Sequence, residues 1–184
     1  MATVARDDAG PSHETFMLDF AALIVFPALM AYAAASDLLT MTIPNKVSLA
    51  LVIAFAVFAV GSGLPWQTVA MHVAAGILVL TVAFGLFAFG WIGGGDAKLA
   101  AATALWLGFN TLMEYLVIST VAGGLLTLGI LSLRGWPLPL FALRWDWLSR
   151  LHDKRSGVPY GIALAGAALV VYPHSPIWGG MLGS

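Results

Sequence analysis

Long apolar runs, separated by short polar segments, dominate this sequence. Of its 184 residues, 60% are hydrophobic and only 9% are charged, and the mean hydropathy is +0.93. Several runs approach the ~20 residues that an α-helix needs to cross a lipid bilayer. A soluble domain of this length could not bury so much apolar surface. The sequence therefore predicts an all-α, polytopic integral membrane protein. We expect it to be embedded in the lipid bilayer and not to bind nucleic acid.

The apolar runs predict about six transmembrane helices. We expect them over residues 16–36, 46–60, 66–91, 97–109, 112–133 and 160–178. The fourth is short, because it covers only ~20 Å at 1.5 Å per residue, against a hydrocarbon core of ~30 Å. In the fifth, Gly123 and Gly124 predict a close contact with a neighbouring helix. Residues 1–15 are expected to form a polar tail, and residues 16–184 one membrane domain.

Most of the basic residues fall in the segment 134–159. Within it, Asp146, Arg150 and other polar residues recur at helical spacing on one side, and apolar residues fall on the opposite side. This pattern predicts a helix lying in the membrane interface. A solvated loop with incidental tryptophans is the alternative. Because Lys and Arg are retained on the cytoplasmic side, this segment indicates the cytoplasmic face. Six crossings then place Lys46 and Lys98 on the same face and both termini outside.

A glycine triplet, Gly93, Gly94 and Gly95, is followed at once by an acid, Asp96. Glycine permits positive φ and leaves the backbone uncovered, so the triplet predicts a loop that another chain can approach closely. Asp96 itself has two readings. It is either the N-cap of the helix that follows, or a carboxylate that the protein uses, since an idle acid is costly in so apolar a chain.

A second acid, Asp37, closes the first predicted helix, at the end where the helix dipole disfavours an acid. The helices at 46–60 and 66–91 separate Asp37 from Asp96, so two crossings return both acids to one face. Two facing carboxylates suit the activation of a water. Like charges at short range do not both ionise readily, so one carboxyl can hold a proton while the other acts as base. Such a pair titrates as a unit, and sequence alone does not assign the base.

Three further residues of these polar segments, Pro44, Asn45 and Lys98, have both a structural and a functional interpretation. Pro44 and Asn45 are explained most simply as a helix stop and a helix cap, with contact to substrate as the alternative. Lys98 either follows the positive-inside rule or favours the charged form of a nearby aspartate. The chain has no cysteine and four scattered histidines, so we expect neither a metal site nor a cofactor.

Taken together, these motifs resemble those of the type IV prepilin peptidases, the GxGD class of membrane aspartyl proteases. The resemblance covers about residues 36–165 and is carried by Gly-Gly-Gly-Asp-Ala-Lys at 93–98, by Asp37 with Ile43-Pro44-Asn45, and by Val158-Pro159-Tyr160-Gly161-Ile162-Ala163. It implies that Asp37 and Asp96 are catalytic aspartates. They would cleave the leader of a prepilin or pseudopilin precursor at the cytoplasmic face of a bacterial inner membrane. In a protease, the glycines are expected to leave room for an extended substrate backbone.

The longer members of that family carry an additional cytoplasmic domain with a cysteine quartet, which accompanies N-methylation of the product. This chain has neither, so it is more similar to the short, peptidase-only enzymes of Flp-type tight-adherence pilus systems. From the residues alone, two other functions remain open. A small proton-coupled transporter would hold the two acids near the middle of the membrane. A non-catalytic pilus or secretion assembly protein differs only in activity. The oligomeric state stays open.

Overall fold

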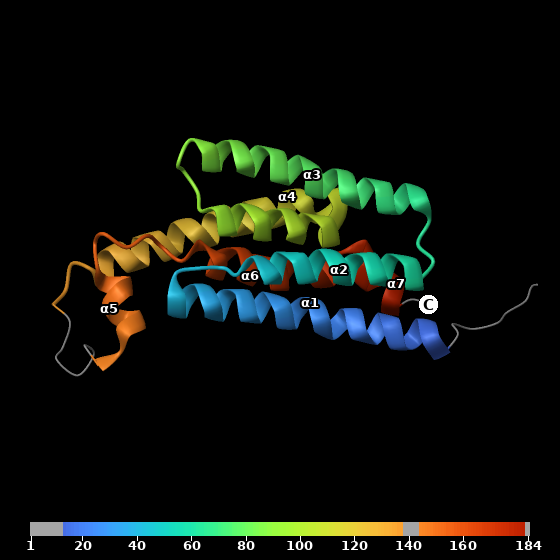
Figure 1. Cartoon of the computed structure of the whole chain (residues 1–184), viewed down its shortest axis with the longest axis horizontal. Helices are drawn as coiled ribbons and strands as arrows, with labels where there is room; N and C mark the ends of the chain where they lie inside the picture. The colour runs from blue at the N-terminus through green and yellow to red at the C-terminus, as the bar shows by residue number, and fades with distance from the viewer. Residues whose placement is uncertain (1–12, 138–143, 183–184) are drawn as a thin grey trace, which may run out of the picture.

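The computed structural model describes residues 13–137 and 144–182, so most of the predicted tail at 1–15 lies outside the described residues. Every regular element in the described part is helical, which confirms the predicted fold class (Figure 1). In chain order the elements are α1 (His13–Thr40), α2 (Asn45–Gly61), α3 (Trp66–Ala88), α4 (Gly94–Leu133), α5 (Asp146–His152), α6 (Tyr160–Val171), η2 (Tyr172–His174) and α7 (Pro176–Leu182). Three of them, α1, α3 and α4, are long and apolar enough to cross a membrane, and α2 and α6 are shorter apolar helices.

The longest element, α4, folds back on itself at Gly108. This residue has φ 63° and ψ −178°, which is extended left-handed backbone in the middle of a helix. The chain reverses there, so that a first leg (residues 94–107) and a second leg (residues 109–133) run side by side in opposite directions (Figure 1). The predicted break between two helices in this stretch is confirmed. With α1, α2, α3 and α6, the two legs make a bundle of six helical segments.

The ends of the helices follow from Gly and Pro positions. Gly90 has φ 75°, and the N–H of Trp91 donates to the carbonyl of Leu86 at 3.0 Å, a Schellman motif that ends α3 at Ala88, three residues before the predicted end at 91. The predicted helix at 160–178 is interrupted. It divides into α6, η2 and α7, because Pro173 and Pro176 cannot donate the backbone hydrogen bonds of a continuous helix.

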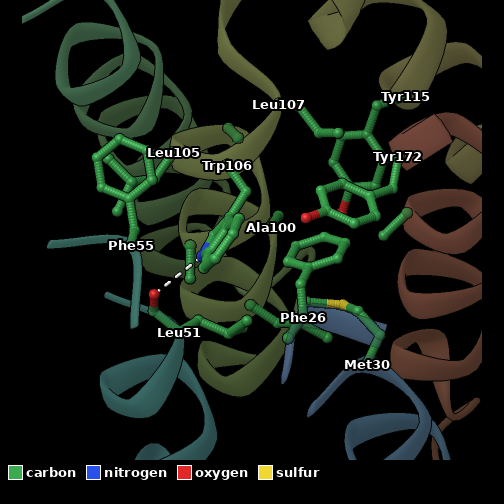
Figure 2. Packing of buried hydrophobic residues seen from close by; sticks show 14 of the residues in the cluster. Phe26, Met30, Leu51, Phe55, Ala100, Leu105, Trp106, Leu107, Tyr115 and Tyr172 are labelled. Carbon is green, nitrogen blue, oxygen red and sulfur yellow. Dashed lines mark hydrogen bonds between the residues drawn. The ribbon is translucent and has the colours of Figure 1, made fainter. Parts of the chain in front are cut away.

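The core of the bundle is built around Trp106, on the first leg of α4 (Figure 2). Its indole N–H donates to the carbonyl of Leu51 in α2 at 2.9 Å. The rings of Phe26, Phe55 and Tyr172 lie within 6.2 Å of its ring, centroid to centroid. Lipid is as apolar as these side chains, so close packing and hydrogen bonds, more than exclusion from water, hold such helices together. The cluster therefore fixes the first leg, whose opposite end carries Asp96.

The contact between α3 and α4 depends on a small residue. A Cβ added at Gly76 would lie 3.3 Å from the carbonyl oxygen of Ala101 and 3.3 Å from Cβ of Leu105. Only glycine lets the two backbones approach so closely without displacement. For Gly123 and Gly124, the sequence predicts a close contact with a neighbouring helix. The contact is confirmed for Gly123, where a Cβ would lie 3.1 Å from the ring of Tyr160. It is not present at Gly124, where a Cβ would meet nothing within 4 Å.

Candidate aspartate site

Asp96 is the third residue of α4, and its neighbours are not arranged as the sequence suggested. The helix begins at Gly94 and its N-cap is Gly93, so the predicted loop over Gly93, Gly94 and Gly95 is wrong for the last two, and Asp96 is not the N-cap. None of the three glycines has a positive φ. The carboxylate of Asp96 lies against the backbone of Gly93, so that a Cβ at Gly93 would be 2.8 Å from its Oδ2. An acid in a first helical turn also suits the helix dipole.

Close packing within the chain explains the two helical glycines. A Cβ at Gly95 would lie 3.2 Å from Cβ of Ile43, and one at Gly94 would lie 3.2 Å from Cε2 of Phe87. The triplet therefore lets the start of α4 approach the α1–α2 connection and the end of α3. The close approach that the sequence predicts is present, but the partners are residues of the same chain, and the glycines serve it without unusual backbone angles.

Asp37 lies in the last turn of α1, which continues to Thr40, one turn beyond the predicted end. The residue is buried, with 5% of its surface exposed. Its Oδ2 accepts a hydrogen bond of 2.7 Å from the backbone N–H of Gly161, in the first turn of α6. The first N–H groups of a helix have no partner within that helix and attract anions. The negative charge of Asp37 is thus unfavourable at the C-terminal end of α1 and favourable at the N-terminal end of α6.

The turn after Asp37 brings a third element to the site. Met41 has φ 54°, which is uncommon for a residue other than glycine, and its N–H donates to the carbonyl of Asp37 at 2.8 Å. The chain then places the buried Ile43 between the starts of α4 and α6. A Cβ at Gly161 would lie 2.7 Å from Cδ1 of Ile43 and 2.8 Å from Oδ2 of Asp37. Ile43 is thus the spacer that separates the two elements to which the aspartates are attached.

Pro44, Asn45 and Lys98 form a second link between helix starts. Pro44 is the N-cap of α2, Asn45 is its first residue, and no side-chain capping hydrogen bond is present, so the predicted cap at Asn45 is wrong. Proline supplies the extended backbone before the helix, which leaves the amide of Asn45 free for another partner. Its Oδ1 accepts a hydrogen bond of 3.0 Å from Nζ of Lys98. The two exposed residues tie the start of α2 to the first turn of α4.

The two aspartates come from different helices to the same end of the bundle, because Ile43 lies against Gly95, next to Asp96, and against Gly161, whose N–H binds Asp37. The structure thus brings both acids to one end of the bundle, and their placement on one face of the membrane stays a prediction. Their surroundings differ, because Asp37 is buried and Asp96 is half-buried and lines a cavity of about 570 Å³. Within residues 13–137 and 144–182, no three His, Cys, Asp or Glu side chains form a group that could hold a metal ion. The arrangement offers two acids and a cavity that one of them lines.

Arg134, the C-cap of α4, supports this end of the bundle and was not singled out from the sequence. It is buried, with 9% of its surface exposed. Its guanidinium donates to three backbone carbonyls, those of Leu151 at 2.8 Å, Ser156 at 3.0 Å and Gly157 at 2.9 Å. The last two lie just before α6, so Arg134 fixes the approach to the N–H that binds Asp37. The importance of Arg134 is indicated by its burial and by its several directed hydrogen bonds. Both become visible only in the structure, because the partners lie 17 to 23 residues away in the sequence.

The helix predicted at Asp146 and Arg150 is present as α5, and Arg150 connects it to the aspartate end. Nη2 of Arg150 donates to the carbonyl of Leu39 at 2.6 Å, two residues after Asp37. This carbonyl is in the last turn of α1 and has no partner within the helix, so a cation is favourable there. Together, Arg134 and Arg150 attach α5 to the ends of α4 and α1 (Figure 1).

Residues 24–128 match the model of the type IV leader peptidase family. That stretch is more than half of the 184 residues and includes both Asp37 and Asp96. The chain belongs to this family. No curated protein and no solved structure matches it. Family membership and the apolar helical bundle together make the protein a membrane protease of the leader-peptidase kind.

Proposed function

We propose that this protein is an aspartyl endopeptidase that cleaves the leader peptide of type IV prepilins, of the Flp type, at the cytoplasmic face of the bacterial inner membrane. The observation that carries the proposal is the convergence of Asp37 and Asp96 at one end of the bundle, beside a cavity of about 570 Å³ that Asp96 lines. Two described basic residues, Arg134 and Arg150, lie at the same end, which supports a cytoplasmic orientation for the site.

In the proposed reaction, the two carboxyl groups share one proton and hold one water. The ionised carboxylate removes a proton from that water as its oxygen attacks the carbonyl carbon of the scissile amide. The protonated carboxyl donates to the carbonyl oxygen, which stabilises the tetrahedral intermediate. Transfer of a proton to the amide nitrogen then releases the new amino terminus. Gly161 contributes by holding one oxygen of Asp37, so that the other is oriented toward the water.

The two rival functions differ from this proposal in testable ways. A proton-coupled transporter needs acids near the middle of the membrane. Asp37 is three residues from the end of α1 and Asp96 is the third residue of α4, so both lie at helix ends. A non-catalytic assembly protein has no such geometric signature, and only the chemistry distinguishes it from a peptidase.

The decisive experiment replaces each aspartate by asparagine in purified protein and measures cleavage of an Flp-type prepilin. Asparagine keeps the size of the side chain and an acceptor for the Gly161 N–H, so the fold should persist while the titrating group is lost. We expect Asp37→Asn and Asp96→Asn each to lose at least ~1000-fold in rate. The double variant should be little worse than either single one, because the two groups act as a unit.

Asp153→Asn is the matched control, because Asp153 is exposed and its contact is local. Its carboxylate accepts a hydrogen bond of 2.9 Å from the backbone N–H of Arg155, two residues later. It should cleave at nearly the unmodified rate. Cleavage should also persist in the presence of a chelator, as expected for carboxylates that act on water directly. Prepilin processing by either single aspartate variant at a rate close to that of the unmodified protein would contradict the proposal.

A further inference from the structure

The first turn of α6 is fixed by a tight turn that precedes it. Pro159 has φ −74° and ψ 81°, and the N–H of Tyr160 donates to the carbonyl of Val158 at 2.9 Å, which is an inverse γ-turn. The N–H of Ile162 donates to the carbonyl of Pro159 at 3.3 Å. The N–H of Gly161 lies between these two in the chain and donates to the carboxylate at the end of α1 at 2.7 Å. The direction of the Gly161 N–H therefore depends on where this turn lies.

The side chain of Tyr160 attaches this turn to the second leg of α4. A Cβ added at Gly123 would lie 3.1 Å from the ring of Tyr160, so glycine makes room for the ring. The hydroxyl of Tyr160 is 2.9 Å from Oγ1 of Thr127. Thr127 donates its own proton to the carbonyl of Gly123 at 2.7 Å. The Tyr160 hydroxyl is therefore the donor of the bond between the two helices, and its ring spans one turn of the second leg.

The bond between Tyr160 and Thr127 lies beside the apolar length of the second leg. Thr127 is six residues before the end of α4, which is ~9 Å along a helix that is long and apolar enough to cross a bilayer. A hydroxyl that loses its partner in apolar surroundings has little water to replace it. Hydrogen bonds between membrane helices help to hold them in one relative position. This bond is therefore suited to fix the start of α6 against the second leg.

Arg134 and Tyr160 hold the entry to α6 at different points. Arg134 binds the carbonyls of Ser156 and Gly157, which lie before the turn. Tyr160 is the first residue of α6 and the direct neighbour of Gly161. A displacement of Tyr160 therefore passes to the Gly161 N–H through a single peptide unit, whereas one at Arg134 must pass through the whole turn.

We propose that Tyr160 is a positioning residue for the peptidase reaction. Its hydroxyl, bonded to Thr127, holds the first turn of α6 where the N–H of Gly161 meets the carboxylate of Asp37. Tyr160 also lines the cavity beside Asp96, so contact with the substrate is the alternative that the test must separate. This inference rests on the proposed function and adds to it a pair of residues that orient one of the two acids.

The first test removes this bond from either side and measures cleavage of prepilin. Tyr160→Phe keeps the ring against Gly123 and removes only the hydroxyl, and Thr127→Val removes the acceptor at nearly the same volume. We expect kcat to fall about fivefold in each variant with KM unchanged, the scale of one hydrogen bond between membrane helices. The double variant should match either single one, because both changes remove the same bond. Thr127→Ser keeps a hydroxyl and should cleave at nearly the unmodified rate.

Two control variants make the same chemical changes elsewhere. Tyr32→Phe removes the hydroxyl of an exposed tyrosine on α1. Thr81→Val removes a hydroxyl that donates at 2.8 Å to the carbonyl of Ile77, within α3 alone. Both should keep the unmodified kcat and KM. A rise in KM at unchanged kcat in Tyr160→Phe would assign Tyr160 to substrate binding and overturn its role in positioning.

The second test observes the Gly161 N–H by nuclear magnetic resonance and does not need activity. In protein made with isotope-labelled glycine, the amide signal of Gly161 is the one lost in Gly161→Ala. This signal should shift in Tyr160→Phe and in Thr127→Val, because its bond to Asp37 lengthens, and stay in place in Tyr32→Phe. An unmoved signal, or an unchanged kcat, overturns the positioning role while leaving the peptidase proposal intact. Failure of the unmodified protein to cleave prepilin overturns the proposed function, and this inference with it.

Discussion

The two ends of the bundle are held together in different ways. At the aspartate end, charged or backbone groups from distant parts of the chain bond to one another, as between Gly161 and Asp37 and between Arg134 and three carbonyls. At the opposite end, aromatic rings pack around Trp106, and a buried His72 lies 2.9 Å from the carbonyl of Leu105. Aromatic packing, with hydrogen bonds at Trp106 and His72 within it, thus supports the fold at one end. At the other end, hydrogen bonds set the geometry of the acids. Substitutions at the two ends should therefore separate activity from stability.

The largest effect on cleavage outside the aspartates is expected at Gly161. A Cβ there would lie 2.7 Å from Ile43 and 2.8 Å from the carboxylate of Asp37, so Gly161→Ala must shift the acid or the start of α6. A displacement of about 1 Å at a reacting group costs ~100-fold in rate. Gly166→Ala, in the same helix and with nothing within 4 Å of the added Cβ, should be neutral. Similar rates for the two variants would show that the Gly161 contact does not position Asp37.

Sequence reasoning reached the helices and the meeting of the acids because both depend on simple periodic or counting rules. Apolar runs predict crossings, and two crossings return Asp96 to the end where Asp37 lies. The partners of the site could not be obtained in this way. The bonds from Gly161 to Asp37 and from Arg150 to Leu39 join residues more than 100 positions apart, and no local pattern encodes them. The glycine triplet was misread for the same reason, since its contact with Ile43 is tertiary.

The next largest effect is expected at Arg134. Arg134→Gln can keep at most some of the hydrogen bonds to the carbonyls of Leu151, Ser156 and Gly157. The segment before α6 should therefore shift, and the N–H of Gly161 should move with it. We expect kcat to fall about tenfold with little change in KM, because Arg134 does not line the cavity beside Asp96. Tenfold corresponds to ~1.4 kcal/mol. Steady-state kinetics on prepilin, with thermal unfolding measured on the same preparations, tests this. A rise in KM with kcat unchanged would assign Arg134 to substrate binding instead.

Lys98→Met should have a much smaller effect at the same end. Its amine donates to Asn45 at 3.0 Å, and both residues are exposed, so solvent competes for this bond. We expect the cleavage rate to change by less than about threefold, and Asn45→Ala to behave alike because it removes the other partner. The double variant should match either single one. A loss comparable with that in Asp96→Asn would instead place the Lys98 charge in the chemistry of the carboxyl pair.

The smallest effect on cleavage, with a large effect on stability, is expected at the opposite end. Gly108→Ala places a side chain at φ 63°, where its Cβ would lie 2.9 Å from the ring of His72. The strain of such a conformation is ~1–3 kcal/mol, and the clash adds to it. Gly63→Ala separates the two causes, because Gly63 has φ 62° and nothing within 4 Å. We therefore expect the unfolding temperature to fall more in Gly108→Ala than in Gly63→Ala.

The rate of cleavage per folded molecule should stay close to the unmodified value in both variants. Asp96 lies twelve residues before Gly108, ~18 Å along the first leg, and the packing around Trp106 lies between them. Unfolding monitored by tryptophan fluorescence, together with prepilin cleavage at a temperature where each variant is fully folded, measures the two quantities separately. If cleavage falls in proportion to stability in Gly108→Ala, strain at the turn reaches the first helical turn of α4. The two ends of the bundle would then act as one unit, and the division between a packed end and a hydrogen-bonded end would not hold.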